Sequence, residues 1–261
     1  MCGRYASSRR PEDLVEEFEI DKSEVKETLA PDYNVAPTKE VYAVVQRLPS
    51  KEKDGPAQRQ LRVLTWGLVP SWAKDPSIGN RMINARMETV TEKPAYRKAF
   101  AVRRCLLPAD GYYEWYTTAQ GTGTGKRRRR VKQPFFIHPA AGGVMAMAGL
   151  YEIWRDPTRA EDDPNRFRWT CTVLTTSAED ELGHIHDRMP LLVEKDRYAA
   201  WLDPAVSSAD DLLPLLVPAA PGRLRAYPVS TEVNNVKNNG PELVEPLATE
   251  PSEPSEPPEP A

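Results

Sequence analysis

VMAMAGLYEIW (144–154) and RWTCTVLTT (168–176) are the two segments that decide the fold of this 261-residue chain. Both combine β-branched and aromatic residues with flanking turn formers, which is typical of strands. Four further segments have the same character: VYAVVQ (41–46), LRVLTW (61–66), RCLLPADGYYEWY (104–116) and PFFIH (134–138). Together the six segments predict a protein in which strands dominate.

Helical patterns are fewer. Residues 11–20 have apolar side chains at helical spacing, and Pro11 suits the first position of a helix. The other candidates are 195–202 and 209–216. Because strands and helices do not alternate regularly, we expect an α+β fold: a single domain with a curved, mainly antiparallel, barrel-like sheet and peripheral helices.

The chain divides into a folded domain and a tail. We expect one domain over residues 1–247 and a disordered acidic tail at 248–261, where Pro, Glu and Ser leave little apolar surface to bury. The segment TTAQGTGTGKRRRRVK (117–132) is expected to form a long hairpin tip, because its glycines are flexible and its five consecutive basic residues repel one another.

Composition leaves several classes of partner open. Hydrophobic residues make up 40% and charged residues 28%, as in ordinary soluble proteins. No apolar run is long enough to span a bilayer, and MCGRYASSRR is polar and basic, so we expect a cytoplasmic protein with no membrane partner. The net charge of −3 includes four glutamates of the tail; the remaining 35 basic and 34 acidic residues still allow a basic groove for nucleic acid.

The three cysteines point away from metal or disulfide frameworks. Cys2, Cys105 and Cys171 are widely spaced and odd in number, so neither a disulfide set nor a four-cysteine zinc site is expected. We predict no metal and no cofactor. His184 and His186 lie close in sequence, but no further ligand has convincing spacing.

Cys2 carries the most informative chemistry. Removal of Met1 leaves an α-amine beside a thiol, and an amine with an ordinary pKa of ~7.7–8.0 is partly neutral at physiological pH. Such an amine condenses with an aldehyde to an imine, and the thiol then closes a thiazolidine ring. From its position alone, Cys2 is better explained as an incidental small residue on a frayed terminus, because most termini are disordered.

Eight segments, in order along the chain, resemble the SOS-response-associated peptidase (SRAP) family of abasic-site-processing proteins. They are MCGRY (1–5), YNVAPT (33–38), WGLVPSW (66–72), INARMET (83–89), GYYEWY (111–116), QPFFI (133–137), HDRMP (186–190) and VNNVKNNGPELVEP (233–246). The resemblance implies that the chain binds single-stranded DNA and cross-links through Cys2 to the ring-opened aldehyde of an abasic site.

The resemblance also implies catalytic partners for Cys2. Asn84 in INAR matches the active-site asparagine; outside the family context it reads equally well as a turn residue. Glu114 in YYEW matches the catalytic glutamate, and its aromatic neighbours favour a raised pKa, although strand alternation alone would let it face solvent. His186 in HDRMP matches the catalytic histidine, which can give a proton to the opening sugar; His184 is the rival outside the motif.

DNA binding requires cations for phosphates and flat rings for bases. Arg4, Arg86 and Arg188 lie inside matching motifs and resemble phosphate ligands, while Trp72 and Trp115 are candidates for stacking. Four other tryptophans are assigned to the core: Trp66, Trp154, Trp169 and Trp201. Some family members have a second tryptophan where this chain has Ala73, which weakens the stacking prediction. The basic run 126–130 is read as a solvated loop; added DNA affinity and a nuclear-import signal have the same composition.

The sequence is compatible with three functions. The first is a cross-linking enzyme for abasic single-stranded DNA, a lyase or hydrolase by class, active as a monomer in the DNA damage or SOS response and in reach of the replication machinery. The second is a cysteine peptidase with an incidental DNA role, although no oxyanion-hole motif is legible and only Met1 precedes the cysteine. The third is a non-catalytic module that binds single-stranded DNA.

Overall fold

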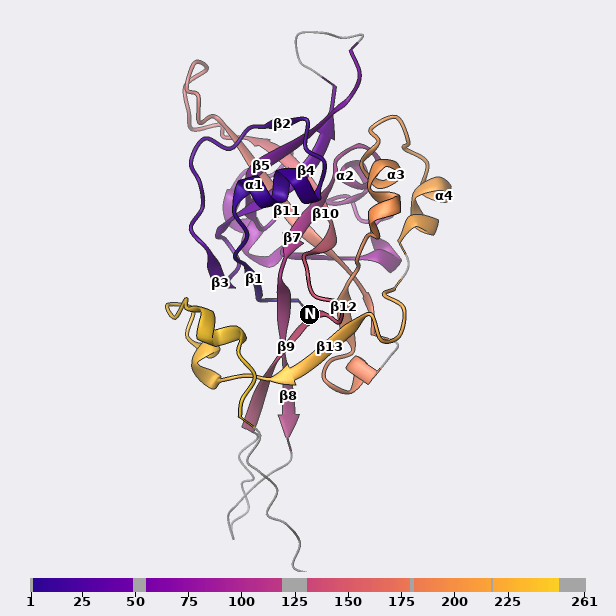
Figure 1. Ribbon diagram of the computed structural model, residues 1–261. Helices are drawn as coiled ribbons and strands as arrows, with labels where there is room; N and C mark the ends of the chain where they lie inside the picture. Colours follow the sequence, from indigo (N-terminus) through magenta and orange to yellow (C-terminus); the bar gives the residue numbers. More distant parts are fainter. Residues whose placement is uncertain (1, 49–54, 119–130, 179–180, 217, 249–261) are drawn as a thin grey trace, which may run out of the picture.

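The structure is a computed structural model that describes residues 2–48, 55–118, 131–178, 181–216 and 218–248. Within these ranges strands predominate and form two sheets, one above the other in Figure 1. The strands are β1 (Tyr5–Ser7), β2 (Lys22–Ser23), β3 (Asp32–Val35), β4 (Glu40–Arg47), β5 (Gln58–Trp66), β6 (Asn84–Arg86), β7 (Arg104–Ala109), β8 (Gly111–Thr118), β9 (Val131–Pro139), β10 (Met145–Arg155), β11 (Phe167–Ser177), β12 (Arg188–Pro190) and β13 (Leu224–Pro228). The α-helices are α1 (Pro11–Glu17), α2 (Arg97–Val102), α3 (Tyr198–Leu202) and α4 (Ala209–Leu212).

Five strands of the larger sheet close into a barrel. β4 pairs antiparallel with β5 and β7, and β10 pairs antiparallel with β7 and β11. β5 then meets β11 in parallel register, at Thr65 with Thr170 and Trp66 with Cys171. The ring β5–β4–β7–β10–β11 therefore returns to its start, which confirms the expected barrel-like, mainly antiparallel core.

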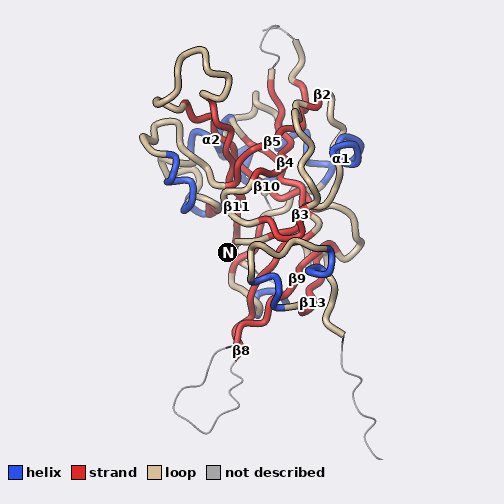
Figure 2. Tube along the Cα trace, turned by 90° about the vertical axis from the view of Figure 1, so that its left-hand side faces the viewer, coloured by secondary structure: helices blue, strands red, loops and turns tan. Residues whose placement is uncertain are grey.

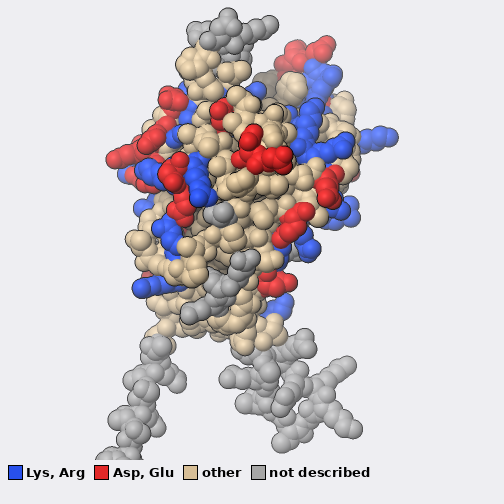
Figure 3. All heavy atoms as spheres, turned by 90° about the vertical axis from the view of Figure 1, so that its right-hand side faces the viewer, with Lys and Arg blue, Asp and Glu red and all other residues tan. Residues whose placement is uncertain are grey.

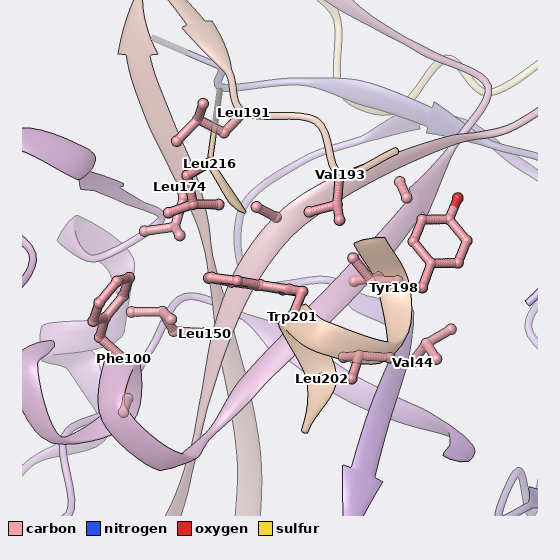
Figure 4. Close-up of a cluster of buried hydrophobic side chains, with 14 of the residues drawn as sticks. Val44, Phe100, Leu150, Leu174, Leu191, Val193, Tyr198, Trp201, Leu202 and Leu216 are labelled. Carbon is pink, nitrogen blue, oxygen red and sulfur yellow. The ribbon is translucent and has the colours of Figure 1, made fainter. Parts of the chain in front are cut away.

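The barrel strands bury both faces. Side chains alternate along a strand, so Val41, Ala43 and Val45 of β4 join the inner cluster with Trp66, Cys105 and Cys171. The outer face is covered by helices: Figure 4 shows Phe100 of α2 and Trp201 of α3 beside Leu150 and Leu174 of the barrel. This double burial explains why the barrel strands read as nearly continuous apolar runs.

The second sheet has the order β13–β9–β8–β1–β3 and lies below the barrel (Figures 1 and 2). The chain passes from β7 of the barrel to β8 of this sheet at Asp110, whose carboxylate accepts a hydrogen bond from the backbone N–H of Ser8 at 2.6 Å. A Cβ on Gly111 would lie 2.6 Å from the carbonyl oxygen of Ile137, so only glycine fits this crossing. Reading 104–116 as one strand was therefore wrong: β7 belongs to the barrel and β8 to the second sheet.

The predicted helices are present but short. The helix expected at 11–20 ends at Glu17, and the two later segments each divide into an α-helix and a 3₁₀ turn: η4 (Lys195–Arg197) before α3, and η5 (Leu213–Leu215) after α4. The remaining 3₁₀ turns are η1 (Pro76–Arg81), η2 (Met87–Thr89), η3 (Glu181–His184), η6 (Thr231–Asn234) and η7 (Pro241–Val244).

Two sequence predictions fall wholly or mostly outside the described residues. β8 and β9 pair as far as Thr118 with Val131, which makes them arms of one hairpin, but its predicted tip at 119–130 lies outside. The predicted acidic tail also lies outside from residue 249 onward.

No helix among the described residues is long and apolar enough to cross a membrane. On the face drawn in Figure 3, basic side chains lie among acidic ones.

Candidate active site

Cys2 lies where the barrel meets the second sheet. It directly precedes β1, which is held by β8 and β3 through the pairs Tyr5 with Tyr112 and Tyr5 with Val35. Cys2 is fully buried and belongs to the inner cluster of the barrel. Burial raises the pKa of its thiol far above the ordinary value, and the nearby Glu114 charge raises it further. The thiol is therefore neutral at physiological pH.

Asn84 fixes the main chain of Cys2. Its Nδ2 donates to the carbonyl oxygen of Cys2 at 2.8 Å. Asn84 begins β6, which runs parallel to β11 with Asn84 opposite Val173. The Oδ1 of Asn84 is buried and has no hydrogen-bond partner among the described residues, which costs about 1–3 kcal/mol unless a ligand or water satisfies it. The side chain thus holds the residue after Met1 and keeps one acceptor available.

Glu114 is a buried carboxyl group on β8. It lies opposite Phe135 of β9 and is only 3% exposed. Burial raises its pKa from 4.5 to about 7, because the charged form loses its hydration. A carboxyl group that is about half protonated near neutral pH can both give and take a proton. The alternative of a solvent-facing glutamate is wrong.

His186 lies beside Glu114. Its Nε2 is 4.0 Å from Oε2 of Glu114. Its Nδ1 is 3.0 Å from the backbone nitrogen of Arg188 and 2.9 Å from Oδ1 of Asp187. Partial burial lowers the pKa of the imidazole, which favours the neutral ring. The structure thus brings together the four residues expected to be catalytic, from four separate segments.

Arg4 and Trp115 contact each other, and both form hydrogen bonds within the protein. The guanidinium of Arg4 donates to Oδ1 of Asn34 at 2.6 Å and to the carbonyl oxygen of Val233 at 2.8 Å. It also lies 5.8 Å from the centre of the Trp115 ring, whose Nε1 donates to Asn234. Both predicted DNA ligands therefore already have protein partners.

The other predicted DNA ligands differ in exposure. Trp72 is 60% exposed, the largest exposed fraction among the described large hydrophobic side chains, and Arg86 is exposed at the end of β6. The side chain of Arg188 is 10% exposed and forms an ion pair with Glu88 at 2.6 Å. Its charge is already balanced, so its role as a phosphate ligand stays a prediction.

The aromatic residues assigned to the core are mostly buried. Trp66, Trp154 and Trp201 are no more than 1% exposed. Trp169 is only partly buried and is stacked on Tyr151. His184, the rival of His186, packs edge-on against Tyr116. Among the described residues no group of three or more His, Cys, Asp or Glu side chains could hold a metal ion.

Three residues around the site were not predicted from the sequence. Asn34 is fully buried, and its Nδ2 lies within hydrogen-bond distance of the carbonyl oxygens of Val233, Asn235 and Asn238. Glu88 pairs with Arg188, and Asp187 contacts His186. All three lie inside segments that carry the family resemblance. Their residue types did not indicate a role, because the partners of Asn34 and Glu88 are distant in the chain.

Comparisons with known proteins show which family the chain is similar to. The model of the family "SOS response associated peptidase (SRAP)" matches residues 1–236. The chain is 39% identical over 245 residues to the abasic site processing protein YoqW of Bacillus subtilis (strain 168), covering 94% of this chain and 99% of YoqW. It is 31% identical over 254 residues to the abasic site processing protein YedK of Escherichia coli (strain K12), covering 95% of this chain and 100% of YedK.

The fold also has a counterpart among crystal structures. A protein from Bacteroides thetaiotaomicron superposes with a TM-score of 0.74 at 23% identity, covering 95% of this chain and 100% of that one. At that identity the likeness shows the fold alone. The family model and the two relatives extend over nearly the whole described chain, and we conclude that it belongs to the SOS response-associated peptidase (SRAP) family.

Proposed function

We propose that this protein processes abasic sites in single-stranded DNA by forming a covalent adduct through Cys2 once Met1 has been removed. The observation that carries the proposal is the arrangement of Cys2, held by Asn84, next to Glu114 and His186. The names of the relatives support the same substrate class, since YoqW and YedK are named abasic site processing proteins.

The first step requires an open sugar, because only the ring-opened abasic site offers an aldehyde. His186 and Glu114 lie 4.0 Å apart at Nε2 and Oε2, so both can reach one sugar oxygen. With its pKa near 7, Glu114 supplies a proton to the ring oxygen as readily as it removes one. Each such acid–base contribution is worth roughly 10²–10⁴-fold in rate.

The amine acts before the sulfur. The amine adds to the aldehyde carbon and water leaves, giving an imine. The buried thiol is neutral, so its proton must be transferred as sulfur bonds to the imine carbon. Glu114 can accept that proton and return one to the nitrogen, which closes a thiazolidine with a net loss of one water.

DNA contacts are proposed for the exposed candidates first. Trp72 is free to stack on a base, and Arg86 can pair with a phosphate. Arg4 and Trp115 form one preorganised pair. The face of the Trp115 ring away from Arg4 and the remaining N–H donors of Arg4 would contact the DNA strand. One copy of the chain supplies every residue of this arrangement, which supports a monomeric enzyme of the DNA damage response.

The test is covalent capture on a denaturing gel. Purified protein with verified loss of Met1 is incubated with single-stranded DNA that bears one abasic site. The wild type should give a heat-stable shifted band. Cys2→Ser keeps the amine but lacks the sulfur, so it should give a band only after borohydride reduction of the imine. Absence of a band with fully processed wild type would falsify the proposal.

A second variant tests the holding residue. Asn84→Ala removes the hydrogen bond to Cys2, and we expect cross-linking to slow by roughly tenfold or more, because a misplaced nucleophile loses much of its advantage. Binding of undamaged single-stranded DNA should change little. Cross-linking at the wild-type rate by Asn84→Ala would show that Asn84 does not position the nucleophile.

A further inference from the structure

We propose that Glu88 is a positioning residue, which acts through Arg188 to hold His186 as the tautomer with its proton on Nε2, the nitrogen facing Glu114. The kinetic side of this inference rests on the proposed function. Its structural side concerns the free protein and can be tested without DNA.

The ion pair between Glu88 and Arg188 is bidentate. Nη1 of Arg188 donates to Oε1 of Glu88 at 2.6 Å, and Nη2 donates to Oε2 at 3.0 Å. Nη2 also donates to the backbone oxygen of Thr175 on β11 at 2.8 Å. Paired hydrogen bonds to a carboxylate fix both the position and the orientation of a guanidinium. A fourth contact, from Nη2 to the hydroxyl oxygen of Thr175 at 3.2 Å, completes the set that holds the Arg188 guanidinium.

The backbone N–H of Arg188, which the ion pair and the pairing of Arg188 with Ser177 of β11 together hold in place, lies 3.0 Å from Nδ1 of His186. A backbone N–H can only donate, so Nδ1 must present its lone pair. In a neutral imidazole the proton must then reside on Nε2. This nitrogen faces Oε2 of Glu114 at 4.0 Å, where a proton is needed for sugar opening.

A competing contact favours the opposite tautomer. Oδ1 of Asp187 lies 2.9 Å from the same Nδ1, and a carboxylate can only accept, so this contact needs a proton on Nδ1. The two contacts exclude each other in a neutral ring. The Asp187 side chain is 87% exposed, where water weakens its attraction. The backbone of Arg188 is held by the strand pairing and by the Glu88–Arg188 ion pair, which we call the clamp. The charged groups that act on His186 include Glu114, Asp187, Arg188 and the amino terminus, whose charge lowers the pKa of the ring.

The clamp also joins two catalytic segments. Glu88 lies in η2, four positions after Asn84, while Arg188 begins β12, two positions after His186. β6 and β12 both pair with β11, at Thr175 with Arg86 and at Ser177 with Arg188. One ion pair therefore ties the strand that carries Asn84 to the strand that follows His186.

The direct test is the ¹⁵N resonance pattern of His186 in the full chain without DNA. Three histidines are present, so His186→Gln assigns the signal. Above the pKa of the ring, the wild type should show an unprotonated Nδ1 and a protonated Nε2. Glu88→Gln, which keeps the size but removes the charge, should shift the populations towards a protonated Nδ1. Adding Asp187→Asn to that variant should move them back.

The matched control is Glu92→Gln, an exposed glutamate in the turn that follows η2, which should leave the pattern unchanged. A wild-type His186 protonated mainly on Nδ1 overturns the inference directly. So does a folded Glu88→Gln protein with wild-type tautomer populations. If Glu88→Gln does not fold, Asp187→Asn decides: a shift towards protonated Nδ1 contradicts the inference.

The kinetic readout separates positioning from binding. At saturating abasic DNA, single-turnover cross-linking by Glu88→Gln should be roughly tenfold slower, with unchanged affinity for undamaged DNA. Loss of affinity with an unchanged rate would assign Glu88 to DNA binding and overturn the inference. If no variant, including wild type, forms an adduct while the tautomer shift is present, the proposed function fails and the positioning inference stands.

Discussion

Replacing Glu114 with glutamine should stabilise the protein at alkaline pH while abolishing its acid–base chemistry. The carboxyl group is 3% exposed and its pKa rises from 4.5 to about 7 on folding. Because the folded state holds the proton more tightly, stability is greatest below pH ~4.5 and falls as pH rises through ~7. Glutamine is nearly isosteric and carries no charge, so it escapes this loss.

The magnitude follows from the shift. Each pKa unit corresponds to about 1.36 kcal/mol, so the full penalty of the ionised carboxylate is about 3 kcal/mol. Near pH 5 the penalty is still small, since this pH lies close to the ordinary pKa of 4.5 at which the carboxyl group of the unfolded chain ionises. The stability difference between Glu114→Gln and wild type should therefore grow by about 2–3 kcal/mol between pH ~5 and pH ~8. For a chain of this size that is roughly 4–12 °C in the melting temperature.

Urea unfolding at a series of pH values measures the difference. Glu16→Gln, an exposed glutamate on α1, is the matched control and should show little pH-dependent change in stability relative to wild type. A Glu114→Gln protein whose stability follows that of wild type at every pH would refute the argument, because it would mean that Glu114 is hydrated and titrates normally. If Glu114→Gln is more stable and no longer cross-links, the protein keeps a destabilising buried carboxyl group at Glu114 because its activity requires it.

Three further variants and one control variant test the surface and the backbone. Trp72→Ala should weaken single-stranded DNA binding by about 1–3 kcal/mol without lowering the melting temperature, since the ring is 60% exposed; unchanged binding by fluorescence titration would exclude it as a stacking platform. Arg86→Ala should reduce the slope of log affinity against log salt by about 1, and an unchanged slope would mean that it meets no phosphate. Gly67→Ala should destabilise the fold by about 1–3 kcal/mol, because Gly67 has φ +131° and its Cβ would lie 2.7 Å from the oxygen of Gly79. Gly142→Ala, with positive φ but open space, should cost less in urea unfolding, and equal losses would refute the steric argument.

The strands were predictable because their signal is local. Alternation and β-branched content located six segments that contribute to β4, β5, β7, β8, β9, β10 and β11. The short strands β1, β2, β3, β6, β12 and β13 have two to five residues each and were not predicted. Such short strands form because they hydrogen-bond to a longer neighbouring strand, so their own sequence carries little information about them.

For the site, the sequence determined the reactive groups: a cysteine directly after the initiator, a glutamate between aromatic residues, and a histidine in a matching motif. Only the tertiary structure decided what surrounds them. It placed His186 beside Glu114, paired Arg188 with Glu88, and buried Glu114 so that its pKa rises to about 7. Periodicity and residue chemistry are properties of neighbours along the chain, whereas burial, ion pairing and tautomer choice depend on side chains that only the folded barrel and its second sheet bring together.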